Sequence, residues 1–246
     1  MSTEQHLAKA KEHKHRADNL RQKMDKLEPY LLSGLSFYLA GLSMERGREE
    51  RSHQMYRDTQ ELLNFACKLK DSSSVKAELT ERDRCLQLLL LRLRASLNHR
   101  MYGLKRQEAS KLKRTIDQEL NKLSTSKAST GTPSPLSPPV SSPAGSVCSQ
   151  GSAASTGNAR ATGLSHWQRK YMNIMAVLTD ALELWAEADR MAGQGLHDVF
   201  AKCDRVCGPL TFHSEPQAVV RYMRHCLTLL PSTLPRAPSA PASRAS

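Results

Sequence analysis

Apolar residues, chiefly leucine, recur along much of this chain at intervals of three, four and seven residues. That spacing places them on one face of an α-helix, whereas a half-buried strand would alternate at every second residue. Aromatic residues make up only 5% of the chain, which is low for a β-sandwich or barrel. We therefore expect an all-α protein of antiparallel helical hairpins, arranged as a bundle or a helical-repeat array.

The first half of the chain is predicted to hold four helical stretches, over residues 5–28, 30–45, 49–70 and 78–123. The second of these is apolar almost all round, so it should lie at the centre of the domain. Pro29 is expected either to end the first helix or to start the second. The fourth stretch is one long helix or two, and Gly103 is the expected bend.

The composition then changes abruptly, because residues 124–163 are mainly Ser, Thr, Pro, Gly and Ala. Such a segment buries too little apolar surface to offset its chain entropy, so we expect a disordered linker. Three further helices are predicted over 164–191, 196–207 and 214–230, the last capped by Ser214. The domain is thus predicted as two helical parts, 5–123 and 164–230, followed by a disordered tail over 231–246.

The chain carries a formal net charge of +12. This favours an acidic partner, whether nucleic acid, a protein segment or a membrane surface, although nuclear residence and solubility would explain it equally well. No apolar run is long enough to span a membrane, and the polar N-terminus is unlike a signal peptide. The six cysteines are therefore expected to be reduced, in the cytosol or the nucleus.

The sequence contains no motif for phosphate binding, nucleophilic catalysis or zinc proteolysis. We therefore expect no catalytic residues, no enzyme activity, no cofactor and no metal. The strongest metal candidate is Cys203 and Cys207 on one helical face, together with His225 and Cys226. The commoner explanation is that these cysteines are small buried apolar residues.

A set of basic residues follows one predicted helix and could contact phosphates without sequence preference. No aromatic residues accompany it in the pattern of a base-reading motif, and a solvated helix face is the commoner explanation. The set consists of Arg100, Lys105, Arg106, Lys111, Lys113 and Arg114.

Four Ser/Thr-Pro steps occur in the linker, at Thr132, Ser134, Ser137 and Ser142. Proline-directed kinases act on such sites, and the added phosphates would give the linker the charge to meet the basic residues. The alternative is that these pairs arise from the composition alone.

Both tryptophans lie after the linker. Trp167, Trp185 and Tyr222 could line a ligand pocket, but at helical spacing they are most simply core residues. Part of their stripe could instead face a second chain, because interfaces favour Trp and Tyr. Leu182, Trp185 and Tyr222 are our predicted dimer-interface residues.

The succession of segments resembles a known family. YLLSGLSFYLAGLSME is followed by MYRDTQELLNFACKLK, LLLLRLRASLNHRMYGLKRQEASK, the linker GTPSPLSPPVSSPAGSVCSQGS and finally GPLTFHSEPQAVVRYMRHCLTLL. Together they are similar to the C-terminal homology domain of the ALF family, which includes the AF-four and FMR-two proteins and fly Lilliputian. The resemblance covers about residues 5 to 230.

This resemblance implies a tetratricopeptide-like helical fold and a function. It implies a nuclear scaffold of the super elongation complex, which forms homodimers or heterodimers with family paralogues and indirectly recruits positive transcription elongation factor b. It also implies that RNA or DNA binding is an alternative. Family proteins are much longer, so we expect this chain to be a fragment or a short form that competes for dimerisation.

Overall fold

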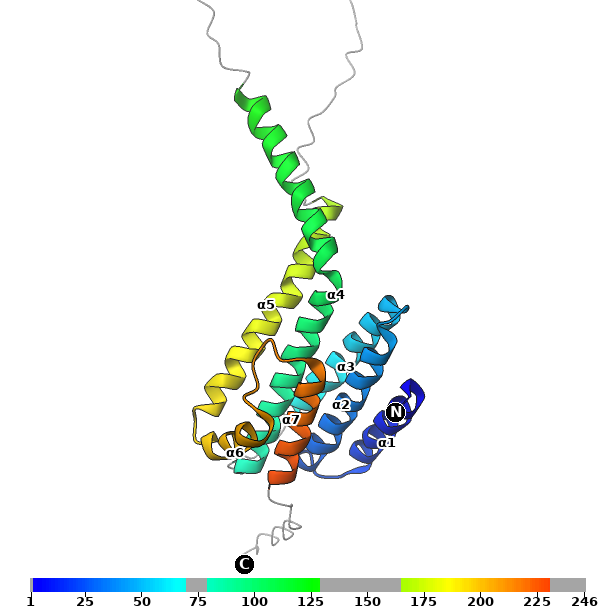
Figure 1. Ribbon diagram of the computed structural model, residues 1–246, viewed down its shortest axis with the longest axis vertical. Helices are drawn as coiled ribbons and strands as arrows, with labels where there is room; N and C mark the ends of the chain where they lie inside the picture. Colours follow the sequence, from blue (N-terminus) through cyan, green and yellow to red (C-terminus); the bar gives the residue numbers. More distant parts are fainter. Residues whose placement is uncertain (1, 70–78, 129–164, 231–246) are drawn as a thin grey trace, which may run out of the picture. The chain divides into compact units, whose positions relative to one another are not determined.

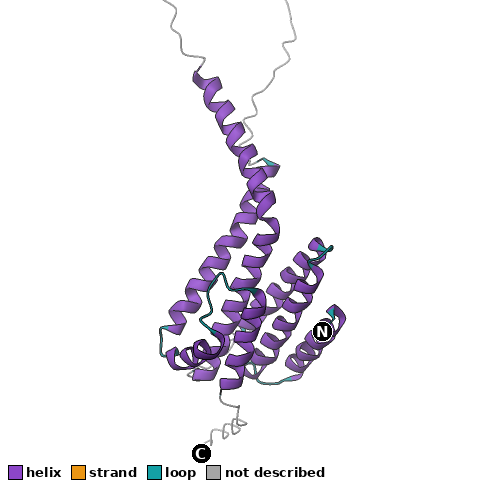
Figure 2. Cartoon of the chain, in the orientation of Figure 1, coloured by secondary structure: helices purple, strands orange, loops and turns teal. Residues whose placement is uncertain are grey.

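The computed structural model describes residues 2–69, 79–128 and 165–230 (Figure 1), and within those ranges every regular element is a helix (Figure 2). The prediction of an all-α fold is confirmed. The elements are α1 (Thr3–Asn19), the 3-10 helix η1 (Met24–Lys26), α2 (Leu27–Met44), α3 (Glu49–Lys68), α4 (Glu81–Ala128), α5 (His166–Ala192), α6 (His197–Cys207) and α7 (Pro216–Leu229).

The predicted tail and most of the predicted linker lie outside the described residues, as do Thr132, Ser134, Ser137 and Ser142. The chain divides into two compact units, which do not coincide with the two predicted helical parts. Unit 1 combines Met1–Arg106 with Ile174–Ser246, and unit 2 is Gln107–Asn173.

Helix α2 lies at the centre of the N-terminal helices of unit 1, as its nearly all-round apolar sequence predicts. It packs antiparallel to α1 on one side and to α3 on the other. Small residues allow these close approaches: the Ser33 hydroxyl donates to the carbonyl oxygen of Ala10 at 2.8 Å, and Gly41 lies against the ring of Tyr56.

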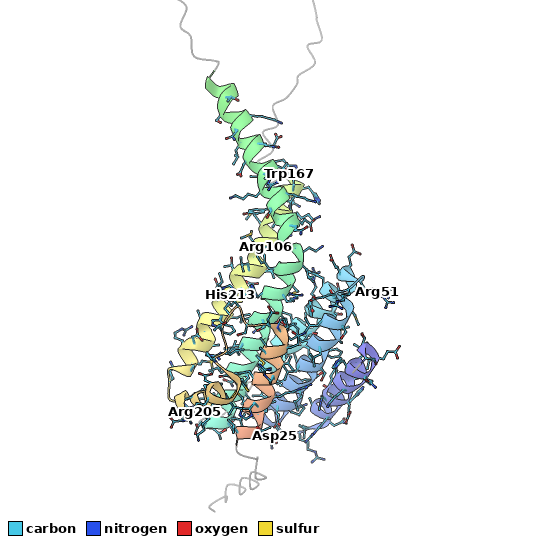
Figure 3. All side chains as sticks on the ribbon, viewed as in Figure 1. Asp25, Arg51, Arg106, Trp167, Arg205 and His213 are labelled. Carbon is cyan, nitrogen blue, oxygen red and sulfur yellow. A yellow bond between two sulfur atoms is a disulfide. The ribbon has the colours of Figure 1, made fainter. Side chains whose placement is uncertain are left out.

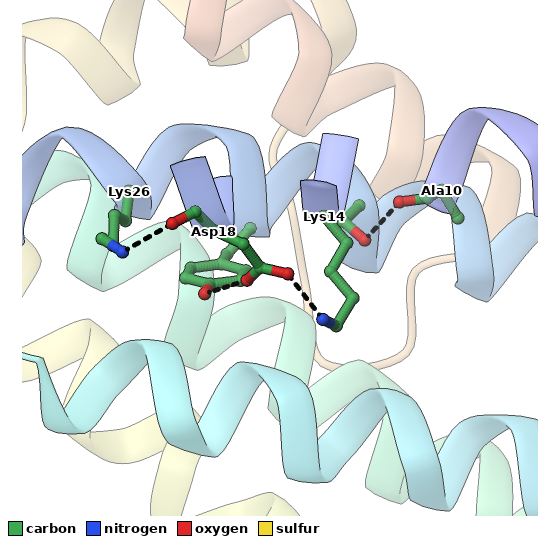
Figure 4. Close-up of polar contacts among 6 residues, drawn as sticks. Ala10, Lys14, Asp18 and Lys26 are labelled. Atoms are coloured by element: carbon green, nitrogen blue, oxygen red, sulfur yellow. Dashed lines mark hydrogen bonds and ion pairs between the residues drawn. The ribbon is translucent and has the colours of Figure 1, made fainter. Parts of the chain in front are cut away.

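Asp18, at the end of α1, accepts hydrogen bonds from three side chains (Figure 4). The Tyr30 hydroxyl donates to its carboxylate at 2.7 Å, the Lys14 ammonium pairs with it at 2.8 Å, and Lys26 donates to its backbone carbonyl at 3.2 Å. The hydrogen bonds from Lys14 and Tyr30 lower the pKa of Asp18. These contacts hold the α1–α2 hairpin closed at its turn.

The first half of α4 completes the core of unit 1. Leu88, Leu89, Leu90 and Leu93 are fully buried there. The same apolar cluster includes residues from after the linker, among them Phe200 of α6 and others on α7. Helices from both sides of the linker therefore share one core.

Two predicted boundaries are wrong near Pro29. Helix α1 ends at Asn19 rather than at residue 28, because Leu20 adopts an extended backbone conformation with ψ 141°. Helix α2 begins at Leu27, so Pro29 lies in its first turn. Backbone N–H groups in a first turn have no intrahelical partner, so proline is tolerated there.

Of the two alternatives for residues 78–123, one long helix is confirmed, because α4 runs without a break through Gly103 from Glu81 to Ala128. A single glycine weakens a helix without ending it. The helix even continues into the predicted linker, where the hydroxyls of Ser124 and Thr125 bond to carbonyls of the preceding turn. Ser214 does not cap α7; its hydroxyl accepts from the backbone N–H of Thr211 at 2.9 Å.

Gly41 and Gly103 should respond oppositely to alanine. A β-carbon at Gly41 would overlap the buried ring of Tyr56, whereas one at Gly103 meets no atom within 4 Å. We expect Gly41→Ala to cost about 1–3 kcal/mol in the free energy of unfolding. Gly103→Ala should gain about 0.5–1 kcal/mol. Urea denaturation followed by circular dichroism measures both, and equal effects would contradict the packing around Gly41.

Candidate interaction surfaces

A buried arginine on α4 organises the helices that follow the linker. Arg92 is only 8% exposed, and its guanidinium carbon lies 5.2 Å from the ring centroid of Trp185 and 5.4 Å from that of Phe200. One of its terminal nitrogens lies 3.2 Å from a carboxylate oxygen of Asp189. Arg92 thereby joins α4 to α5 and α6, and a cation over two aromatic faces is favourable when water is excluded.

Tyr222 was predicted at a dimer interface, but it lies in the core of unit 1 with 1% of its surface exposed. Its hydroxyl donates to Asp204 at 2.7 Å, which ties α7 to α6. Burial, and then this contact with Asp204, raise the pKa of Tyr222. Tyr222 is spaced with Val219, Met223 and Cys226 as on one face of a helix, which is a core pattern. This spacing in the sequence could have indicated that Tyr222 is buried.

Helix α5 has two apolar faces. Ala181 and Ala188 are fully buried, and Val177 packs against the core of unit 1. The second face, which we call the α5 stripe, is partly or largely exposed. It consists of Ile174, Met175, Leu178, Leu182 and Trp185.

Two of the predicted interface residues belong to the α5 stripe. Leu182 is its most open member, with 51% of its surface exposed. Trp185 is half-buried, because Arg92 lies over its ring and the ring of Phe212 meets it at a centroid distance of 5.7 Å. The stripe therefore has a fixed aromatic end and an open aliphatic centre.

The loop between α6 and α7 fixes that aromatic end. Phe212 also contacts His99 of α4 at a centroid distance of 4.5 Å, and His213 follows it on the same loop (Figure 3). Burial, then the charges of His213 and Arg100, lower the pKa of His99, so a neutral imidazole is favoured in this aromatic cluster. The ring contacts with His99 and Trp185 hold Phe212 between α4 and α5.

Three of the six predicted basic residues interact with other groups of the chain. The guanidinium of Arg100 makes two contacts with the Glu45 carboxylate, one of them a 2.7 Å hydrogen bond from Nε, and the Tyr56 hydroxyl donates to the same carboxylate at 2.5 Å. Lys105 and Arg106 also interact with other groups of the chain. Lys111, Lys113 and Arg114 belong to unit 2 and are exposed. Nucleic-acid binding by the six residues stays a prediction.

The candidate metal ligands are arranged differently from the expectation. Cys203 and Cys226 form a disulfide between α6 and α7, with their Cα atoms 5.8 Å apart, so the expectation that all six cysteines are reduced is wrong here. Cys85 and Cys207 are free thiols. In the described part of the chain, no three His, Cys, Asp or Glu side chains are grouped to hold a metal ion.

In residues 2–69, 79–128 and 165–230, no helix is both long enough and apolar enough to cross a lipid bilayer.

The sequence matches known proteins over nearly its whole length. The chain matches the family described as AFF4, C-terminal homology domain, over residues 1–234. The chain belongs to this family. It is 34% identical to mouse AF4/FMR2 family member 3 over 252 residues, which covers 95% of this chain and 20% of that protein. The resemblance noted in the sequence is thereby confirmed.

Two less similar relatives belong to the same family. Human AF4/FMR2 family member 2 is 32% identical over 92% of the chain, and AF4/FMR2 family member lilli of Drosophila melanogaster is 28% identical over 92%. The chain spans 18% of the first of these proteins and 14% of the second. Each of the three relatives is therefore at least about five times the length of the part matched here.

Replacing Arg100 should destabilise unit 1 rather than remove a contact with a binding partner. Burial alone would raise the pKa of Glu45, but the hydrogen bonds from Arg100 and Tyr56 outweigh it and lower that pKa. The contact therefore stabilises the fold above the ordinary carboxyl pKa, and this contribution is lost as the pH falls through the lowered value. We expect Arg100→Gln to cost about 1–3 kcal/mol at neutral pH.

The difference between Arg100→Gln and the unchanged protein should shrink towards pH 4, where Glu45 of the variant takes up a proton. Urea denaturation at pH 7 and pH 4 measures this. Arg114→Gln is the matched control, because Arg114 is exposed and no ion pair engages it. Equal stability of the two variants at neutral pH would count against the structural role of Arg100.

Replacing Arg92 should cost more stability than replacing its ionic partner, Asp189. Arg92→Ala removes a buried cation from two aromatic faces, and we expect a loss of about 2 kcal/mol or more in unfolding free energy. Asp189→Ala should cost below about 1 kcal/mol, because the Asp189 side chain is 55% exposed and can be hydrated. Thermal and urea unfolding of both variants measure the ranking, and the reverse order would show that the ion pair dominates.

Proposed function

We propose that this domain is the dimerisation and scaffold domain of a nuclear regulator of transcription elongation. It pairs with a second copy or with family paralogues. The observation that carries the proposal is the α5 stripe, an apolar helix face left open by the core of unit 1. Membership of the AF4/FMR2 family supports the scaffold role.

The composition of the stripe favours a second copy as the occupant. A two-fold interface brings the same patch of both chains together, so any net charge on it would be opposed by an equal charge. The α5 stripe itself carries no charged residue, and the carboxylate of Asp189, one turn beyond Trp185 on the same face, is paired with Arg92, although the chain as a whole has a net charge of +12. Self-association through this face therefore avoids the repulsion that most other surfaces of the chain would bring.

The residues beside the stripe also suit a helix partner. Thr179 and Ala186 flank it on its outer side, and both are small, neutral and exposed. Small side chains allow the backbones of two helices to approach closely while their apolar side chains interdigitate. A second α5 helix could thus pack against Leu178 and Leu182 with its own copies of those residues.

Recruitment of elongation factors would then be indirect. This domain would hold together longer family members, and those would bring positive transcription elongation factor b and other elongation factors to the super elongation complex. A chain limited to this domain would compete for such pairing when added to nuclear extract.

Leu182→Glu tests the interface without disturbing the core, because half of the Leu182 surface is already exposed. A buried carboxylate facing its own copy should raise the dimer dissociation constant at least tenfold, about 1.4 kcal/mol. Sedimentation velocity over a concentration series measures it.

Val206→Glu is the matched control, because Val206 of α6 is 68% exposed and receives the same change of charge. It should dimerise as the unchanged chain does. A chain that stays monomeric at every concentration, and also when mixed with the corresponding domain of AF4/FMR2 family member 3, would refute the proposal. Dimerisation unaltered by Leu182→Glu would move the interface elsewhere.

A further inference from the structure

A disulfide joins α6 to α7. Cys203 and Cys226 are 23 residues apart in the sequence, their Cα atoms lie 5.8 Å apart, and both side chains are fully buried. This Cα separation is usual for a disulfide. Residues 208–215 connect the two helices (Figure 1), so this loop begins and ends on helices that are crosslinked to each other.

Helix α6 has few other anchors in the core. Among its residues 198–207, only Phe200 and Cys203 are buried. A hydrogen bond of 2.7 Å from the Tyr222 hydroxyl to Asp204 adds a second link to α7. A helix of 11 residues is marginal in water by itself, so its order depends on such contacts. Opening the disulfide would therefore remove one of the main contacts that hold α6 against α7.

The enclosed loop supports the aromatic end of the α5 stripe. Phe212, in this loop, contacts the ring of Trp185 at a centroid distance of 5.7 Å and that of His99 at 4.5 Å. A loop whose ends are crosslinked samples fewer conformations than one whose ends can separate. The disulfide therefore favours the position in which Phe212 packs on Trp185.

The proposed nuclear location makes a permanent crosslink unexpected, and this step rests on the proposed function. Glutathione and thioredoxin keep thiols in the cytosol and the nucleus reduced, and a disulfide formed there is usually transient, either catalytic or redox-sensing. Reduction would leave two thiols in the core, where a free cysteine behaves as a small apolar residue. Unit 1 can therefore stay folded with the pair oxidised or reduced.

We propose that Cys203 and Cys226 form a redox switch that controls the aromatic end of the α5 stripe. In the oxidised state the disulfide holds α6 on α7 and keeps Phe212 on Trp185. In the reduced state the loop over residues 208–215 is less constrained, and water reaches Trp185 more often. Oxidation thus strengthens self-association through the stripe, because it fixes the surface that meets the second chain.

The glutathione couple supplies and removes the two electrons. The thiolate of one cysteine attacks oxidised glutathione, whose sulfur–sulfur bond breaks to give a mixed disulfide and one glutathione thiolate. The thiolate of the other cysteine then attacks the protein sulfur of the mixed disulfide, which closes the Cys203–Cys226 bond and releases the second glutathione thiolate. The protons lost by the two cysteines are taken up by the two glutathiones. Because both cysteines are buried, each exchange requires α6 to move away from α7.

The test uses the full chain with Trp167→Phe, which leaves Trp185 as its sole tryptophan. The protein is equilibrated in oxidised glutathione or in dithiothreitol, and alkylation followed by peptide mass spectrometry identifies the linked pair. We expect reduction to raise the acrylamide quenching constant of Trp185 about twofold or more and to lower the Tm by about 5–10 °C. Sedimentation velocity of the unchanged chain should show a dimer dissociation constant raised about threefold or more.

Three variants serve as controls. Cys203→Ala/Cys226→Ala cannot form the link, so it should not respond to dithiothreitol. Cys207→Ala removes a free thiol from the same helix and should respond as the unchanged chain does. Leu182→Glu, which should be monomeric, should keep the redox response of Trp185, so failure of the dimer proposal is distinguishable from failure of the switch.

Either of two results at the cysteines would overturn the switch. One is that no Cys203–Cys226 linked peptide forms in oxidised glutathione. The other is that Cys203→Ala/Cys226→Ala still responds to dithiothreitol, which would place the effect at other thiols. A linked pair whose reduction leaves both the quenching of Trp185 and the Tm unchanged would make the disulfide purely structural. Equal dimerisation in the two states would refute the control of self-association.

Discussion

The position of α5 depends on one buried cation. Arg92 is contributed by a helix before the linker, and the groups that satisfy it, Trp185, Asp189 and Phe200, all come from helices after it. A buried guanidinium is tolerated only where such partners offset its desolvation. Once Arg92 is satisfied by α5 and α6, the rotation of α5 about its own axis is settled, and Ala181 and Ala188 must face the core.

That rotation decides what unit 1 can offer to another chain. With the alanine face turned inward, Leu178 and Leu182 are left on the outside, and Trp185 lies at the border between core and surface. The ring of Phe212 packs against Trp185, so the open aliphatic part of the α5 stripe is left as the contact area. Dimerisation through this face would therefore be a consequence of the interaction that holds the two sequence segments of unit 1 together.

Periodicity in the sequence was sufficient to predict every long helix, because apolar spacing is a local property. It failed where distant partners decide. The pairing of Arg100 with Glu45 joins residues 55 positions apart, so no local pattern distinguished Arg100 from the exposed cations further along α4. Tyr222 was misplaced for a different reason: the general preference of interfaces for tyrosine outweighed its own core spacing with Val219 and Met223. Helix ends such as Asn19 depend on tertiary contacts, here the hydrogen bonds from Tyr30 and Lys26 to Asp18, rather than on composition.

Helix α4 shows how one element can change its role along its length. Near Leu90 apolar residues surround the helix, and burial on all sides follows. From Leu112 onward the apolar residues thin to a single edge among charged ones, while helix-favouring residues keep the backbone regular. An edge that narrow is too small to organise a core. The change from all-round to one-sided apolar character is thus the physical reason why the first half of α4 lies in the core while Leu120, further along the same helix, is 54% exposed.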